Sequence, residues 1–150
     1  MSFPQDKPVR LRVFSLSAHL PAVRGAIEKI CELVGFDNDS VGGIILSVDE
    51  AMTNVIRHAY GGADDKPIEV ELAVLGESEP EGLKISLRDY GRVVDPAKIR
   101  SRDLKDVRPG GLGVHIMTEC MDEVDYSPAD GGGTLLTMIK KLPAKREVGE

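Results

Sequence analysis

The sequence contains no tryptophan, few other aromatic residues and a deficit of positive charge. Among its 150 residues are three tyrosines, three phenylalanines, and 19 lysine and arginine residues against 25 acidic ones, so the net charge is −6. Proteins that bind nucleic acid usually present a basic surface and aromatic stacking platforms, so we do not expect this chain to bind nucleic acid. No stretch approaches the roughly 18 apolar residues of a membrane-spanning helix, so we expect no membrane insertion either.

Cysteine and histidine are scarce as well. Cys31 and Cys120 are the two cysteines, and both lie within apolar helical patterns, outside any CxxC pair. Such thiols are typical of reduced proteins of the cytoplasm. The histidines are scattered along the chain and predict no zinc site. Since residues 1–12 also lack the apolar segment of a secretory signal, the sequence predicts a cytoplasmic protein.

Glycine is the residue type present in excess, at 16 of 150 residues against a usual share of about 7%. Hydrophobic residues at 41% and charged residues at 29% are typical of a globular domain. The length suits one domain, which we place at residues 9–142 between flexible ends at 1–8 and 143–150. Where the glycines lie in this domain therefore bears on its function.

Alternating and helical patterns of apolar residues predict the order of the elements. We expect strands at 9–16, 67–76, 82–91, 124–127 and 134–142, and helices at 21–34, from 37–40 to about 60, and from 111–113 to about 123. A short polar connection joins the second and third strands, which predicts an antiparallel hairpin. The charged, proline-containing stretch 92–109 predicts a long loop of the kind that often forms a lid. This order predicts an α+β fold, with a mostly antiparallel sheet covered by helices on one face.

The predicted helix that ends near residue 60 carries an apolar stripe and a polar face. The stripe is expected to face the core and consists of Ile45, Val48, Met52, Val55 and Ala59. Glu50, Asn54 and His58 follow at intervals of four residues on roughly the opposite face. Periodicity alone favours a solvated polar surface there. The functional alternative is a carboxylate that polarises a hydroxyl or water, one turn from an amide oxygen that ligates a cation such as Mg²⁺.

Two further motifs lie where predicted strands end or begin. Asp89-Tyr90-Gly91 closes the strand 82–91. It is compatible with a plain turn, or with a carboxylate that accepts a hydrogen bond from the exocyclic amine of a bound base. The glycines at 131–133 lead directly into Thr134 and the last strand. They form either a flexible turn or a place where the threonine hydroxyl enters a base pocket.

A third glycine motif, PGGLG at 109–113, opens directly into a predicted helix. Glycine permits close approach of the backbone, and the free amides at a helix N-terminus attract anions such as phosphate. The motif is neither a Walker A loop, which needs a following Lys-Ser/Thr, nor a dinucleotide-binding motif, which needs a βαβ unit. It predicts a phosphate site or, alternatively, only a hinge of the lid.

Taken in chain order, these motifs resemble the ATP-binding GHKL superfamily. The stretches LSVDEAMTNVIRHAY (46–60), RDYG (88–91), GGLGVHIMTECMDEV (110–124) and GGTLLTMIKKL (132–142) are similar to those of the bacterial anti-sigma-factor serine/threonine kinases. The resemblance spans about residues 9–142 and departs from the family at Val93, where a second glycine is common. It implies a histidine-kinase-like ATPase domain, folded as a two-layer α/β sandwich of the Bergerat type with a mixed, mostly antiparallel sheet.

The resemblance also implies a role for each matching residue. Glu50 would be the general base at a substrate serine, and Asn54 would hold Mg²⁺. Asp89 would bind the adenine amine beside Gly91, and Thr134 would complete the adenine pocket. The phosphates of ATP would be lined by Gly110, Gly111 and Gly113.

Function and partners follow from the same resemblance. The chain would bind a sigma factor and hold it inactive, and it would phosphorylate a serine on an anti-anti-sigma antagonist. Arg24, central on the first predicted helix, is either a partner contact or a solvated arginine, and family members commonly form homodimers. The choice among Arg102, Lys105 and Arg108 as the contact of the γ-phosphate stays open. The alternative function within the same fold is a non-catalytic, ATP-dependent protein-binding switch.

Overall fold

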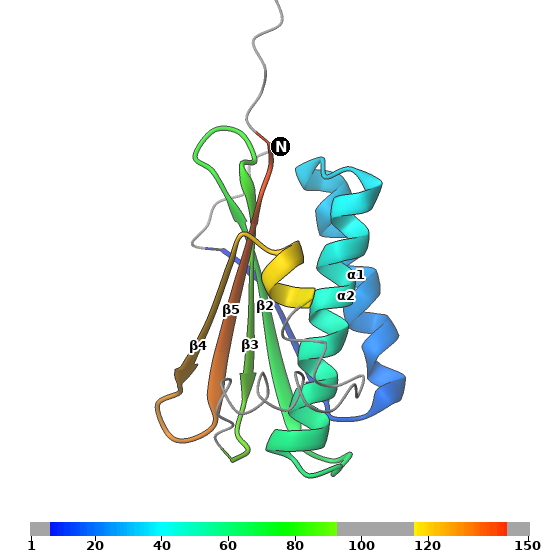
Figure 1. Ribbon diagram of the computed structural model, residues 1–150, viewed down its shortest axis with the longest axis vertical. Helices are drawn as coiled ribbons and strands as arrows, with labels where there is room; N and C mark the ends of the chain where they lie inside the picture. The colour runs from blue at the N-terminus through cyan, green and yellow to red at the C-terminus, as the bar shows by residue number, and fades with distance from the viewer. Residues whose placement is uncertain (1–6, 93–115, 144–150) are drawn as a thin grey trace, which may run out of the picture.

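The computed structural model describes residues 7–92 and 116–143. The elements run β1 (Val9–Phe14), a 3-10 turn (Ser17–His19), α1 (Leu20–Val34), α2 (Asn38–Asn54), a π-helical turn (Val55–Ala59), β2 (Pro67–Leu75), β3 (Gly82–Asp89), β4 (Glu123–Pro128) and β5 (Thr134–Lys141). Residues 116–120 form a further short helical segment before β4. Helices and sheet form two layers, as predicted for an α+β fold (Figure 1).

The five strands form one sheet in the order β1-β2-β3-β5-β4. β2 and β3 pair as the predicted antiparallel hairpin. Every neighbouring pair among the described strands is antiparallel, so this part of the chain does not contain the parallel component expected of a mixed sheet. β5 lies between β3 and β4, with Leu135 opposite Arg88. This connection brings the end of β3 next to the start of β5.

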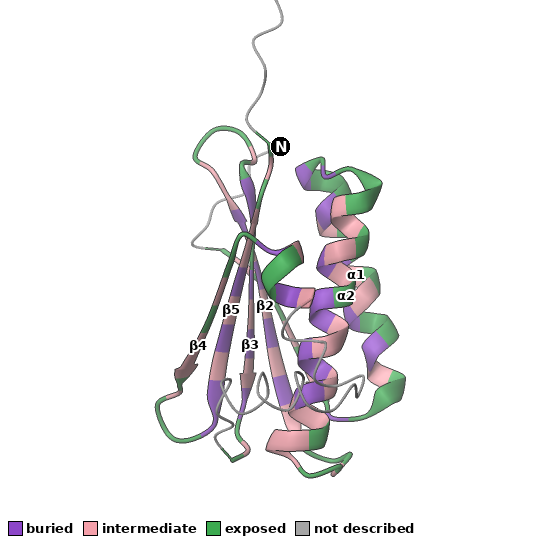
Figure 2. Cartoon of the chain, in the orientation of Figure 1, coloured by how far each residue is buried: buried purple, intermediate pink, exposed green. Residues whose placement is uncertain are grey.

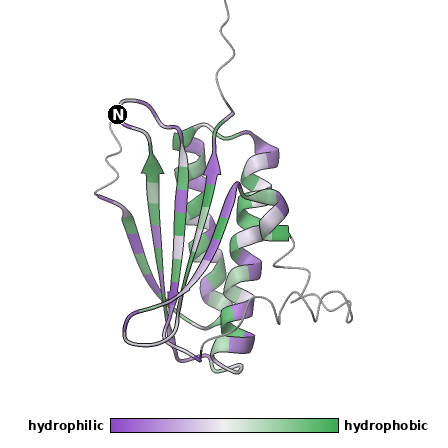
Figure 3. Ribbon diagram, turned by 60° about the vertical axis from the view of Figure 1, so that its left-hand side comes forward, coloured by the Kyte–Doolittle hydropathy of each residue, from purple (hydrophilic) through white to green (hydrophobic). Residues whose placement is uncertain are grey.

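α1 and α2 lie on one face of the sheet, and no described helix covers the other face (Figure 1). Residues that face the other layer are mostly buried, whereas the outer sides of the helices are exposed (Figure 2). Burial alternates strictly along β2, and hydropathy alternates along the strands in the same way (Figure 3). The core consists of apolar residues from both layers, among them the fully buried Ile27, Ile44, Met52, Ile85 and Met138.

The helix boundaries follow residues that start and stop helices. α1 has Pro21 in its first turn, and Gly35 ends the helix in the left-handed conformation at φ 97°. Asp37 caps α2, because its carboxylate accepts a hydrogen bond from the backbone N–H of Ser40 at 2.7 Å. After Asn54 the helix widens into the π-helical turn, and the glycines at 61 and 62 follow with positive φ.

Two expectations about the helices are wrong. Asn54 does not lie on a solvated face: it is only 6% exposed. The buried face of α2 extends beyond the predicted stripe and includes Asn54, whereas Ile45 and Val55 of that stripe are only half-buried. The helix expected to reach about residue 123 stops at residue 120, because Glu123 is already the first residue of β4 and pairs with Ile139 of β5.

The two cysteines agree with the prediction of reduced thiols. Both are free, with Cys31 buried and Cys120 half-buried. Burial raises the pKa of the Cys31 thiol to about 11, so this side chain stays protonated and acts as a small apolar group of the core.

Candidate functional site

A small cavity lies between the C-terminal end of α2 and the adjoining ends of β3 and β5. Its volume is about 30 Å³. The lining residues come from α2, the π-helical turn and three strands: Ala51, Asn54, Val55, Ala59, Leu87, Asp89, Tyr126, Thr134 and Leu136. Asn54, Asp89 and Thr134 are residues that the sequence motifs predict as site residues. The fold therefore brings three separately predicted side chains to one place.

Asn54 is the last residue of α2 and is buried in the wall of this cavity. Neither its amide oxygen nor its amide nitrogen has a hydrogen-bond partner among the described residues. An unpaired buried polar group costs about 1–3 kcal/mol, and native proteins contain few of them. The following π-helical turn is also a feature that is frequent at functional sites. Both observations make Asn54 a candidate ligand-binding residue.

Asp89 ends β3 with its side chain at the cavity, and it is 4% exposed. Its Oδ1 accepts a hydrogen bond from the backbone N–H of Gly91 at 3.0 Å. Burial raises the pKa of Asp89 above its ordinary value, whereas hydrogen bonds from the backbone N–H groups of Gly91 and Thr134 and the nearby Arg88 cation lower it. The carboxyl is thus held in a fixed orientation, where it offers acceptors to a ligand that donates hydrogen bonds.

Gly91 packs against the π-helical turn that follows Asn54. A β-carbon at this position would stand 2.3 Å from the backbone oxygen of Ala59, so a larger residue does not fit without displacing the backbone. The backbone N–H of Arg92 donates to that same oxygen at 3.1 Å. Gly91 therefore does not line the cavity, but it allows the end of β3 to approach the end of α2.

Thr134 begins β5, directly after the turn that connects β4 to β5. It is 8% exposed, and its hydroxyl has no partner within the ranges that the structure describes. A β-carbon on the preceding Gly133, which has φ 81°, would stand 2.0 Å from the backbone oxygen of Asp89. The turn therefore packs on the end of β3, and this contact aligns Thr134 with Asp89.

Glu50 lies one helical turn before Asn54 and outside the residues that line the cavity. Side chains four residues apart on a helix are neighbours, with β-carbons about 5–6 Å apart. Burial raises the pKa of the Glu50 carboxyl above its ordinary value, Arg57 lowers it, and Asp49 raises it. A half-buried carboxyl with a raised pKa beside a binding site is typical of a general base.

The chemistry of these residues fits an adenine nucleotide with a hard cation. Asp89 can accept from an exocyclic amine, the Thr134 hydroxyl can donate or accept, and the Asn54 amide oxygen is of the ligand type that Mg²⁺ prefers. The unpaired buried atoms of Asn54 and Thr134 support this fit. A volume of about 30 Å³ is near that of one water molecule, so these residues form the polar floor of a site and a nucleotide would extend beyond it.

The remaining predicted residues lie elsewhere or outside the described ranges. On α1, Arg24 is not a free cation: its Nε lies 2.8 Å and 2.9 Å from the two carboxylate oxygens of Asp49. Hydrogen bonding to Asp49 and the charge of that carboxylate raise the pKa of Arg24. The residues that fall outside the described ranges are Gly110, Gly111 and Gly113, together with Val93, Arg102, Lys105 and Arg108.

Two supporting residues are missing from the motif analysis. The Tyr60 hydroxyl accepts from the backbone N–H of Tyr90 at 2.7 Å and donates to the backbone oxygen of Pro67 at 2.5 Å, next to the end of β3. A tyrosine at the end of a helix was a weak signal for this role. It suggested only that the hydroxyl would find some hydrogen-bond partner, as buried tyrosines usually do. Arg88 donates to the turn before β5. No sequence pattern near Arg88 predicts its contact with that turn.

Within residues 7–92 and 116–143, no group of three or more His, Cys, Asp or Glu side chains could hold a metal ion. Mg²⁺ is often held by one or two protein oxygens together with phosphates of the substrate. A cation beside Asn54 would be of this kind. In the same two ranges, no helix combines the length and the apolarity needed to cross a membrane.

Comparisons with known proteins support the family resemblance of the sequence. A family model described as a histidine kinase-like ATPase domain matches residues 14–140. A relative named serine-protein kinase RsbW, from Halalkalibacterium halodurans, is 26% identical over 150 residues, which cover 95% of this chain and 88% of the relative. A protein named anti-sigma F factor, from Pasteuria penetrans, is 36% identical over 105 residues, which cover 67% of this chain and 68% of that protein.

Two solved structures share the fold. The crystal structure of the RsbU and RsbW domains of Rv1364c from Mycobacterium tuberculosis matches with a TM-score of 0.63 at 18% identity, over 93% of this chain and 34% of that one. The SiaB-SiaC complex from Pseudomonas aeruginosa matches with a TM-score of 0.59 at 13% identity, over 89% of this chain and 88% of the matched chain. At these identities the likeness concerns the fold alone.

Proposed function

Because this chain belongs to the histidine kinase-like ATPase domain family and, within it, to the anti-sigma-factor kinases, we propose that it is an ATP-binding regulator of a sigma factor. In this proposal it sequesters the sigma factor and phosphorylates a serine on an anti-anti-sigma antagonist, both in the cytoplasm. The structural observation that carries the proposal is the buried amide of Asn54, which lies beside Asp89 and Thr134 and has no partner in the ranges 7–92 and 116–143.

Nucleotide recognition is assigned to the floor of the cavity. The Asp89 carboxylate accepts a hydrogen bond from the exocyclic amine of adenine, and the Thr134 hydroxyl pairs with the same base. Both groups are buried, and a base without a matching group would leave the Thr134 hydroxyl unpaired at a cost of about 1–3 kcal/mol. Gly91 keeps the strand end close to α2. The phosphates are assigned to Gly110, Gly111 and Gly113 by the family resemblance.

Phosphoryl transfer is assigned to Glu50. Its carboxylate accepts the proton of the substrate serine, while the serine oxygen forms the bond to the γ-phosphorus and ADP leaves. Such transfers depend on positioning and charge neutralisation. A Mg²⁺ ion would supply the charge neutralisation at the phosphates, and the Asn54 amide oxygen is the group that would hold it. Half-burial of Glu50 favours the base role, because it raises the pKa of the carboxyl toward neutral pH.

Protein partners are assigned to the surface of α1 around Arg24. The guanidinium is oriented by Asp49, yet 42% of the Arg24 side chain stays exposed, so its remaining donors can meet an acidic group of a partner. Homodimerisation is part of the proposal through the family resemblance, and analytical ultracentrifugation of the purified chain would measure it.

The test combines nucleotide binding with label transfer. The purified chain is incubated with γ-labelled ATP, Mg²⁺ and the cognate antagonist, and we expect label on a serine of the antagonist. Asn54→Ala is expected to abolish Mg²⁺-dependent ATP binding. The matched control is Asn38→Ala, because Asn38 is exposed at the other end of α2.

The outcomes separate the proposal from its alternative. Binding of ATP that depends on Asn54, without any label on the antagonist, contradicts the kinase and supports the non-catalytic switch. Failure of the unmodified chain to bind ATP contradicts both functions.

A further inference from the structure

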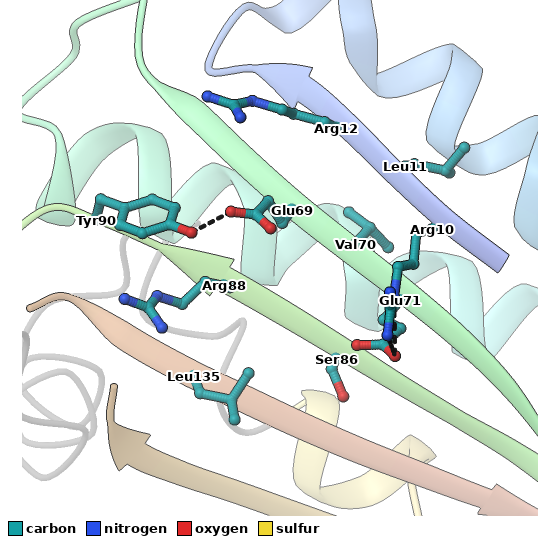
Figure 4. Close-up of a pocket in the computed structure, with 10 residues that line it drawn as sticks. All are labelled: Arg10, Leu11, Arg12, Glu69, Val70, Glu71, Ser86, Arg88, Tyr90 and Leu135. Atoms are coloured by element: carbon teal, nitrogen blue, oxygen red, sulfur yellow. Dashed lines mark hydrogen bonds and ion pairs between the residues drawn. The ribbon is translucent and has the colours of Figure 1, made fainter. Parts of the chain in front are cut away.

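Arg88 lies on β3 immediately before Asp89, but its side chain lies on the opposite face of the sheet. There it borders an open groove of about 470 Å³, together with Glu69, Tyr90 and Leu135 (Figure 4). Successive side chains of a strand point to opposite faces. Arg88 therefore does not line the cavity that Asp89 borders, and any effect on that cavity must pass through the backbone.

The Arg88 guanidinium joins β3 to the turn that connects β4 and β5. Its Nε donates to the backbone oxygen of Asp89 at 3.1 Å. Its Nη2 donates to the backbone oxygens of Asp130 at 2.7 Å and Gly132 at 2.9 Å. The guanidinium carbon also lies 4.3 Å from the centre of the Tyr90 ring, which fixes its orientation. One side chain thus links both sides of the junction between β3 and β5.

Three successive glycines make this turn costly to hold in one conformation. Gly131, Gly132 and Gly133 have φ of 85°, 102° and 81°. Glycine is the residue that loses most conformational entropy when it is ordered. Within the turn, the backbone bonds are Ala129 N–H to Gly133 oxygen at 3.0 Å and Gly132 N–H to Ala129 oxygen at 3.2 Å. The packing of Gly133 on the end of β3 and the two hydrogen bonds from Arg88 together hold the turn in place.

We propose that Arg88 is a positioning residue for base recognition. By anchoring the turn, it keeps the Thr134 hydroxyl and the Asp89 carboxylate directed at the same base. This inference rests on the proposed function, because it presupposes that the cavity binds adenine. Arginine suits the task because its planar fork carries several fixed donors, whereas a lysine has one nitrogen on a flexible stem and cannot satisfy the same set of carbonyls.

The experiment measures the dissociation constants of Mg²⁺-ATP and Mg²⁺-GTP by calorimetry for the full chain and its variants. Arg88→Ala is expected to weaken ATP binding on the order of 10-fold or more, because the hydrogen bonds from the charged guanidinium to the backbone oxygens are lost. The preference for ATP over GTP falls by a similar factor. Arg88→Lys gives an intermediate loss. Lys84→Ala is the matched control, because Lys84 is an exposed cation on the same face of β3, and it leaves both constants unchanged.

Base preference distinguishes positioning from a general loss of structure. A partly unfolded variant shows fewer binding sites per chain, but its folded fraction keeps the ATP preference of the unmodified protein. If Arg88→Ala does not fold, Arg88→Lys decides. The role of Arg88 is overturned if both variants bind ATP with the affinity and the preference of the unmodified chain. It is also overturned if Lys84→Ala loses as much affinity as Arg88→Ala. Either result leaves the proposed function itself standing. If the unmodified chain binds neither nucleotide, the proposed function fails and this inference fails with it.

Discussion

The two faces of the sheet differ in how their polar residues are satisfied. On the open face, charged side chains lie in water and pair across strands, as Arg10 does with Glu71 at 3.4 Å (Figure 4). On the face that the helices cover, Asn54 and Thr134 are buried, and neither side chain has a partner in the described part of the chain. The open face carries more charge, yet the unmet hydrogen-bonding capacity is on the covered face.

This difference shows which polar residues carry information about function. An exposed ion pair contributes about 0–1 kcal/mol, because water competes with it. A buried polar atom without a partner costs about 1–3 kcal/mol. Exposed ion pairs can therefore be lost or gained with little effect on stability. A buried unpaired polar atom lowers stability, so its retention points to a function. A change on the covered side should therefore have a much larger effect than a like change on the open face.

The largest effect is expected for Glu50→Gln. A glutamine cannot accept the serine proton, so phosphate transfer should fall by roughly 10²-fold or more while ATP affinity stays unchanged. Label transfer to the antagonist and calorimetry of ATP binding measure the two quantities. The open-face control is Glu71→Gln, which should transfer phosphate normally. An unchanged rate in Glu50→Gln would remove this residue from the base role.

Asp89→Asn should weaken adenine nucleotides by about 10- to 100-fold, because an amide replaces a charged acceptor at the base. GTP, which lacks the adenine amine, should be affected much less. Fluorescence competition with both nucleotides measures the ratio. Asp125→Asn, an exposed change on the outer strand β4, should alter neither affinity. An equal loss for GTP would mean that Asp89 does not read the base.

Asn54→Leu separates function from stability. Leucine has a similar size and no unpaired polar atoms, so the free energy of unfolding should rise by about 1–3 kcal/mol while Mg²⁺-dependent ATP binding is lost. Urea denaturation measures the stability. Glu71→Leu, which removes the exposed ion pair, should change it by less than about 0.5 kcal/mol. A less stable Asn54→Leu protein would show that Asn54 has a structural partner.

The smallest effect concerns the pH dependence of transfer. Glu50 acts deprotonated, so the rate falls as the pH drops through its pKa, which burial raises and the Arg57 cation lowers. Arg57→Gln should therefore move the acidic limb of kcat/KM to higher pH. High salt should move it in the same direction in the unmodified protein, because Arg57 is exposed and screened. Arg12→Gln on the open face should leave the acidic limb of kcat/KM in place. A shift in Arg12→Gln equal to that in Arg57→Gln would contradict the assigned effect of Arg57 on Glu50.

Much of the fold was predictable because its signals are local. Pro21 and Gly35 bound α1, and the alternation of apolar residues identified β2 and β3. The motif at Asp89 and the glycines before Thr134 were also visible, but plain turns explain such residues locally, so only their combination along the chain pointed to a site. Periodicity failed at Asn54, however, because it measures one helix alone and cannot count the neighbours that pack around its end.

The sequence by itself determined the elements, their order and the chemical types of the site residues, because these depend on residues within a few positions of one another. The tertiary structure alone decided that Asn54 is buried with no partner among the described residues and that Arg88 reaches the turn before Thr134. The contact of Arg88 depends on β5 entering the sheet beside β3, and the burial of Asn54 depends on the packing of α2, so both need distant segments to come together. Hydrogen-bond satisfaction is a property of such contacts, so it can be read only from the folded chain.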